Sequence, residues 1–167
     1  RTCEKLNELG LRAIVATEFE FYLLESGSGS VPVPKMGSIP GTGLKQEGLQ
    51  YSTLEDLWEN DALLMDIHEN CEKQNIPVTT ALSEFSPGQF EINLHHVNDP
   101  IVACDQGAML KRIIKGTSFK HGVGASFMAK PFVDYAGSGL HIHISLYDEQ
   151  GNNVFAIDVP EPSYFSK

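Results

Sequence analysis

Hydrophobic and polar residues alternate one by one in three segments of the chain, as is typical of β-strands with two different faces. The first segment covers residues 13–24 and contains "EFEFYLL", the second contains "QFEINL", and the third contains "HIHISL". Two less regular strands are also predicted. "VTTALS" precedes the second segment, with Pro87 and Gly88 as the turn between them, and "GASFMA" precedes the third. The pattern therefore predicts a sheet built from these segments.

Apolar residues at helical spacing predict helices between the strands. Residues 2–10 are expected to end a helix at Gly10. Residues 52–74 are expected to form a second helix, in which Ser52 and Glu55 have the spacing of a capping box. Both helices would contribute one apolar face to the core.

A third helix is expected to begin at Asp99 and Pro100, which are preferred N-cap and first-turn residues, and to run towards Gly122. Gly107 and Gly116 weaken the prediction that this helix is continuous, because glycine disfavours helix interiors. The resulting order is helix, strand, helix, two strands, helix, two strands. It predicts an α+β fold, with helices packed on one face of a mainly antiparallel sheet.

The chain has 167 residues, of which 41% are hydrophobic, and this length favours a single domain over residues 1–167. Residues 25–50 are rich in Gly, Ser and Pro and are expected to form a flexible loop. This loop does not have the Gly-Lys-Ser/Thr ending of a phosphate-binding P-loop.

The formal net charge of −10, without a cluster of Lys and Arg, argues against a nucleic-acid-binding protein. Three cysteines, Cys3, Cys71 and Cys104, are too few and too far apart for a disulfide framework, and we expect them to be reduced and buried. No apolar run is long enough to span a membrane, so a cytoplasmic protein without a membrane partner is expected.

Acidic and imidazole side chains occupy the polar faces of the alternating strands. Glu18 and Glu20 share one face of their strand, as do Gln89 and Glu91 of theirs. Such faces are often only the solvated side of an antiparallel sheet. If these carboxylates and Glu84 converge, however, their repulsion must be relieved by protons or by a cation.

A divalent cation is the natural solution for such a cluster. Carboxylates with one imidazole favour Mg²⁺ or Mn²⁺ over Zn²⁺, which prefers thiolates and histidines. Four or more carboxylates could hold two ions, and paired ions typically clamp phosphoryl groups. The residue types therefore favour phosphoryl-transfer chemistry.

Successive motifs of this sequence resemble those of the glutamine synthetase catalytic domain, in the same order. These motifs are "TEFEFYLL", "SEFSPGQFEINLHH", and "FMAKPF" followed by "AGSGLHIHISL". The resemblance extends from about residue 11 to residue 153 and implies that residues 1–167 are the first half of such a domain. The residues of these motifs are similar to those of the γ-glutamylpolyamine synthetase branch of the family. Ala136 stands where ordinary glutamine synthetases have an Asn that helps to hold glutamate.

The resemblance also implies roles for individual residues. Metal ligands are expected in two sets, one for each ion. His143 and Ser145 match the strand that contacts the ATP phosphates, and the backbone at Gly137 matches a glutamate contact. The "KP" pair of Lys130 and Pro131 would position the following loop. The first metal set is Glu20, Glu84 and Glu91, and the second contains Glu18 and His141.

The implied reaction joins the γ-carboxylate of glutamate to ammonia or a polyamine, with ATP as co-substrate, through a γ-glutamyl phosphate. Glutamate, ATP and an amine would be the small-molecule partners, and the intact protein would form a homo-oligomeric ring. The family places its substrate-binding arginines and a flap glutamate beyond the region matched here. We therefore expect the 167-residue chain alone to have little or no ligase activity.

Two other functions remain open at this point. A non-catalytic relative could keep the fold for structural or assembly purposes, and it would bind neither Mn²⁺ nor nucleotide specifically. A metal-dependent hydrolase could use the same carboxylates to activate water, and it would bind metal without ATP.

Overall fold

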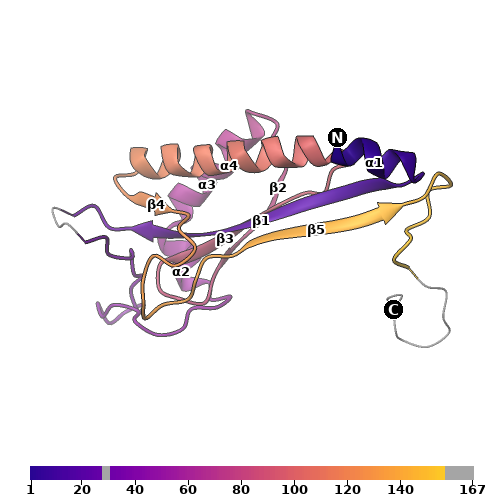
Figure 1. Ribbon diagram of the computed structural model, residues 1–167. Helices are drawn as coiled ribbons and strands as arrows, with labels where there is room; N and C mark the ends of the chain where they lie inside the picture. Colours follow the sequence, from indigo (N-terminus) through magenta and orange to yellow (C-terminus); the bar gives the residue numbers. More distant parts are fainter. Residues whose placement is uncertain (28–30, 157–167) are drawn as a thin grey trace.

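The computed structural model, shown in Figure 1, describes residues 1–27 and 31–156. Strands and helices alternate along the chain in nearly the predicted order. The strands are β1 (Arg12–Leu24), β2 (Val78–Ser83), β3 (Gln89–Leu94), β4 (Gly124–Ser126) and β5 (Leu140–Tyr147). The helices are α1 (Thr2–Glu8), α2 (Glu55–Glu59), α3 (Asp61–Glu72) and α4 (Pro100–Lys120).

Strand β1 is the centre of the sheet and pairs with three other strands. Its middle part pairs with β3 on one side, and β2 continues the sheet beyond β3. On its other side, β1 pairs with β5 over Arg12–Phe19 and with β4 over Tyr22–Leu24. All of these pairs are antiparallel in the described part of the chain, which confirms the predicted sheet.

Helices α3 and α4 pack on one face of this sheet, as predicted. In Figure 1, α4 runs along β1 on that face. Phe19 and Phe21 of β1 point into the core there, while Glu18 and Glu20 point to the opposite face. The burial of apolar side chains between helices and sheet thus fixes the direction of the acidic side chains. The principal core residues are Phe19, Phe21, Leu23, Leu63, Ile67, Phe90, Ile92, Leu110 and Ile114.

Helix α4 begins as predicted and is continuous through both of its glycines. The Asp99 carboxylate caps it by accepting a hydrogen bond from the Ile101 N–H at 2.8 Å, and Pro100 occupies the first turn. A Cβ atom at Gly107 would lie 2.9 Å from Cζ of Phe19. The glycine therefore allows the helix to approach β1 closely, and this packing outweighs its low helix propensity.

The predicted single helix over residues 52–74 is wrong, because the structure divides it at Asn60. Ser52 has a φ of 58° and does not form a capping box, and α2 begins after Leu54. The Asn60 amide donates to the Asp56 carbonyl at 2.8 Å and accepts from Nζ of Lys35 at 2.7 Å. The Asn60 side chain thus competes for the Asp56 carbonyl, which also accepts from the Asn60 N–H at 3.2 Å, and it joins this point of the chain to a distant loop.

The segment expected to be a loop, residues 25–50, contains neither a helix nor a strand in its described part. Residues 28–30 lie outside the described residues. Isolated bridges join Leu24 to Pro34 and Ser38 to Lys45. A Cβ atom at Gly88, which has a φ of +73°, would lie 2.8 Å from the Lys35 carbonyl oxygen. This loop therefore packs closely against the turn between β2 and β3.

The three cysteines are free, but only Cys71 is buried as predicted, and its burial raises the pKa of the thiol to about 11. Cys104 is exposed and Cys3 is half-buried, because α1 and the outer face of α4 are not covered by other described residues. Over residues 1–27 and 31–156, no helix has the length and apolar character needed to cross a membrane.

Candidate metal and nucleotide site

Carboxylates from neighbouring strands converge on the face of the sheet opposite the helices. Glu20 of β1 stands directly opposite Glu91 of β3 in the strand register. On the other side of β1, Glu18 stands opposite His141 of β5. The period-2 alternation of each strand places all four side chains on the same face.

One group of potential ligands consists of Glu20, Glu84 and Glu91, which offer oxygen atoms within 4.8 Å of one another. Glu84 directly follows β2, and its N–H donates to the carbonyl of Gln89 at 2.8 Å. This backbone bond at the end of the β2–β3 hairpin brings Glu84 beside the other two carboxylates. The group contains the three residues expected to bind the first metal ion.

A second group consists of Glu18, Glu91 and His141, whose potential ligand atoms also lie within 4.8 Å of one another. Nδ1 of His141 is 3.0 Å from Oε2 of Glu18 and 3.6 Å from Oε2 of Glu91. Its Nε2 is 3.9 Å from Oε1 of Glu20. The structure therefore brings together both residues expected at the second ion, and Glu91 belongs to both groups.

The electrostatics of the cluster fit a cation. Burial, and then the negative charge of Glu20, raise the pKa of Glu84; burial, and then the charge of Glu18, raise the pKa of Glu91. Among the described residues no lysine or arginine forms an ion pair with these carboxylates, whose only such partners are His141 and His143. Oxygen ligands with one imidazole suit Mg²⁺ or Mn²⁺.

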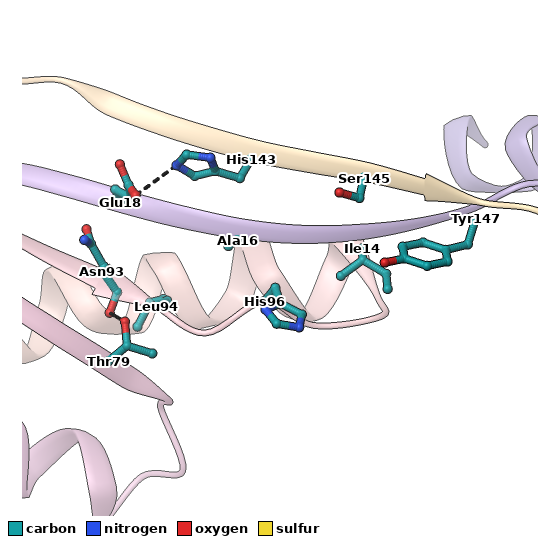
Figure 2. A pocket seen from close by; sticks show the side chains of 10 residues that line it. All are labelled: Ile14, Ala16, Glu18, Thr79, Asn93, Leu94, His96, His143, Ser145 and Tyr147. Carbon is teal, nitrogen blue, oxygen red and sulfur yellow. Dashed lines mark hydrogen bonds and ion pairs between the residues drawn. The ribbon is translucent and has the colours of Figure 1, made fainter. Parts of the chain in front are cut away.

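A cavity of about 430 Å³ adjoins the second group along β1 and β5. Figure 2 shows that it is lined by Glu18 and His143 at one end and by Ser145 and Tyr147 further along β5. Nε2 of His143 lies 2.9 Å from Oε1 of Glu18. The two residues expected to contact ATP phosphates thus line a cavity beside the carboxylate cluster.

His96 also lines this cavity, although its position in the sequence carried no signal for a site. It follows the end of β3, where the alternation of the strand has stopped and side-chain direction can no longer be predicted. The isolated bridge between Val15 and Val97 holds this part of the chain against β1. Only the tertiary structure places His96 in the lining of the cavity that His143 also lines.

The segment between β4 and β5 closes the other side of the carboxylate cluster. The Ser138 N–H donates to the carbonyl of Ala129 at 2.9 Å, and Lys130 donates through Nζ to the carbonyl of Tyr135. A Cβ atom at Gly137 would lie 2.8 Å from the Ala129 carbonyl oxygen, so this turn requires glycine. Lys130 thus holds the loop together, in keeping with its expected positioning role, whereas the described contacts assign none to Pro131.

Gly139 forms the direct contact between this segment and the cluster. Its carbonyl accepts a hydrogen bond from the N–H of Glu20 at 3.1 Å. A Cβ atom on Gly139 would lie 2.7 Å from Oε1 of Glu20 and 3.0 Å from Nε2 of His141. The segment from Ala136 to Gly139 is therefore a wall of the candidate site.

Comparison with known proteins identifies the family to which the chain belongs. Residues 1–166 match the family described as "Glutamine synthetase, catalytic domain". The chain is 40% identical to the gamma-glutamylputrescine synthetase PuuA of Escherichia coli over 156 residues, covering 93% of this chain and 33% of that protein. It is 35% identical to a glutamate–isopropylamine ligase of a Pseudomonas species, again covering 93% of this chain and 33% of the relative.

The fold is also similar to that of a solved GmaS/ADP complex, with a TM-score of 0.77 and 25% identity over 95% of this chain and 34% of the other. The chain thus spans about a third of the length of the curated relatives. These matches confirm the resemblance to the γ-glutamylpolyamine synthetase branch that the motifs indicated. Because the family match covers nearly every residue, the chain belongs to the glutamine synthetase family.

Proposed function

We propose that this chain forms part of an ATP-dependent ligase that joins the γ-carboxylate of glutamate to an amine. The single observation that supports it most strongly is the arrangement of two ligand groups that share Glu91, beside a cavity lined by His143 and Ser145. On a sheet face that is only solvated, carboxylates at such short separations would be unfavourable, because like charges directly opposite each other are destabilising.

Glu20, Glu84 and Glu91 would hold one Mg²⁺ or Mn²⁺ ion, and Glu18 with His141 and Glu91 would hold the second. When bound, such ions neutralise the oxygens of the ATP triphosphate and assist phosphoryl transfer. The chain's own contribution is to fix these side chains on adjacent strands, so that little reorganisation is required when charge develops.

His143 and Ser145 would donate hydrogen bonds to phosphate oxygens from the wall of the adjoining cavity. Nε2 of His143 lies 2.9 Å from Oε1 of Glu18, and this contact fixes the orientation of the ring. The wall that contains Gly137 would line the glutamate site, where backbone groups are exposed to the substrate.

In the proposed reaction, an oxygen of the glutamate γ-carboxylate attacks the γ-phosphorus of ATP, and ADP leaves. The amine nitrogen then attacks the carbonyl carbon of the γ-glutamyl phosphate, the phosphate leaves, and the amine gives up a proton. Ala136, in place of a substrate-binding Asn, supports an amine larger than ammonia as the acceptor. We also propose that the intact protein is a homo-oligomeric ring, as its family membership favours.

The experiment that tests this function is a phosphate-release assay on the intact protein with Mg²⁺ or Mn²⁺. Glutamate, ATP and a diamine are supplied together, each is omitted in turn, and ammonia replaces the diamine in a parallel series. We expect phosphate release only with all components present, and a γ-glutamyl amide detected by mass spectrometry. Hydrolysis of the amide without ATP would instead support a hydrolase and contradict the proposal.

A further inference from the structure

Gln89 is fully buried at the start of β3, two residues before Glu91, and its side chain contacts the carboxylate cluster. Its Nε2 donates to Oε2 of Glu20 at 2.8 Å and to the carbonyl of Gly137 at 3.0 Å. Its Oε1 accepts from the N–H of Ser86 at 3.1 Å. The two acceptors beside Nε2 and the donor beside Oε1 fix the orientation of the amide.

Tyr22 extends this network to Ala136, the residue before Gly137. Its hydroxyl has one proton, which is donated to the carbonyl of Ala136 at 2.7 Å, and it also lies 3.3 Å from Oε1 of Gln89. The N–H of Ala136 donates to Oγ of Ser86 at 2.8 Å. Backbone groups of the wall are therefore hydrogen-bonded to buried side chains of β1 and of the β2–β3 hairpin.

From these contacts we infer that Gln89 is a positioning residue. Its side-chain amide orients the Glu20 carboxylate and holds the wall at Gly137 against β3, the strand to which Gln89 belongs. This inference rests on the proposed metal site. One oxygen of Glu20, Oε2, is occupied by the Gln89 amide, whereas Oε1 lies within 3.9 Å of Nε2 of His141. An amide donor in a buried setting would thus select which carboxylate oxygen faces the cluster.

Gln50 offers a matched control. It is also fully buried, but within the described residues its side chain bonds only to backbone groups, donating to the carbonyl of Gln89 at 2.8 Å and accepting from the N–H of Gly88 at 3.3 Å. Replacing either glutamine with leucine removes buried hydrogen bonds and should lower the melting temperature. Only the change at Gln89 removes a direct bond to a proposed metal ligand.

The test is Mn²⁺ titration of the intact protein by calorimetry, with thermal unfolding measured on the same samples. We expect Gln89→Leu and the near-isosteric, uncharged Gln89→Met to weaken Mn²⁺ binding by about 10- to 100-fold, as is usual when a group that orients a metal ligand is lost. Gln50→Leu should lower the melting temperature and keep wild-type Mn²⁺ affinity.

A double-mutant cycle with Glu20→Ala tests whether Gln89 affects Mn²⁺ binding through Glu20. If Gln89 acts through Glu20, then Gln89→Leu weakens Mn²⁺ binding no further once Glu20 is removed. Wild-type affinity in both Gln89 variants, or equal losses in Gln89→Leu and Gln50→Leu, would overturn the positioning role alone. Absence of Mn²⁺ binding in the wild type would instead overturn the proposed metal site, and the role of Gln89 with it.

Discussion

Glu20 and Glu91 face each other directly across the β1–β3 ladder, and both carboxylates contribute to the same potential ligand group. Like charges at directly opposed positions destabilise a sheet. Burial adds to this cost, because it raises the pKa of Glu91. The metal-free protein therefore holds an unfavourable arrangement that a divalent cation would relieve.

Glu91→Gln should stabilise the metal-free protein by about 0.5–1 kcal/mol, because it removes a like charge opposite Glu20 without changing side-chain size. The same change should abolish stabilisation by Mn²⁺. Thermal unfolding with and without Mn²⁺ measures both effects. Glu47→Gln, at an exposed position outside the cluster, is the control and should show neither. A Glu91→Gln variant that Mn²⁺ still stabilises as strongly as the wild type would refute this prediction.

The pKa values of Glu84 and Glu91 are raised in the folded protein, so protons compete with metal at these carboxylates. Mn²⁺ affinity should therefore fall as the pH is lowered towards the raised pKa values of these groups, and binding should release protons. The calorimetric heat should accordingly depend on the ionisation enthalpy of the buffer. An affinity that does not change with pH would show that these groups are ionised at every pH tested.

The same shifts predict how stability depends on pH without metal. For a carboxyl group whose folded pKa is raised, the stabilising contribution is fully present below the unfolded pKa and is lost as the pH rises through the folded pKa. The contribution of Glu84 and Glu91 to metal-free stability should therefore decrease from acidic to neutral pH. Comparing unfolding curves of the wild type with those of Glu84→Gln isolates it, since the variant should lose part of this pH dependence.

His143→Ala should weaken binding of a non-hydrolysable ATP analogue by about 10-fold, because it removes a hydrogen-bond donor from the cavity beside Glu18. Mn²⁺ affinity is measured separately, because His143 belongs to neither ligand group but contacts Glu18 of the second group. Calorimetric titration with the analogue in the presence of Mn²⁺ measures the nucleotide affinity. His68→Ala is the control, because His68 pairs with Glu72 on the surface of α3, away from the cavity. Equal nucleotide affinity in the two variants would argue against a phosphate contact at His143.

Two glycines of α4 allow the packing of this helix against β1 to be tested with a matched control. Gly107→Ala should destabilise the fold by about 1–3 kcal/mol, because the new Cβ would lie 2.9 Å from Phe19. Gly116→Ala should stabilise it by up to about 1 kcal/mol, since a Cβ there meets nothing within 4 Å and alanine favours helix. Chemical denaturation compares the two variants, and effects of the same sign would contradict the packing described here.

Much of the fold follows from patterns that are local in the sequence. The alternation around Phe19 and Phe21 predicts both the strand and the face that carries its acids, and Asp99 with Pro100 predicts the start of α4. The division of the second helix at Asn60 is not predicted, because the helical pattern continues through this residue and its contact with Lys35 joins residues far apart in the sequence. Local patterns do not record such tertiary contacts.

The candidate site shows the same limit. Of the expected metal ligands, Glu18, Glu20, Glu91 and His141 lie on regular strands, where side-chain direction follows from a period of two. Glu84 directly follows β2, and the structure places it beside Glu20 and Glu91. His96 lies beyond the end of β3 and was not expected in the cavity. The role of Gln89 was missed for another reason. It shares the polar pattern of Glu91, and only its burial and its contacts distinguish it from a solvated side chain.

The number of Mn²⁺ ions bound by wild type and variants tests the two-metal site most directly. Glu91 belongs to both ligand groups, whereas Glu84 belongs only to the first. Calorimetry on the intact protein should therefore find two ions in the wild type, one after Glu84→Ala, and none of comparable affinity after Glu91→Ala. No specific Mn²⁺ binding in the wild type, or a Glu91→Ala variant that keeps both ions, would contradict the proposed site.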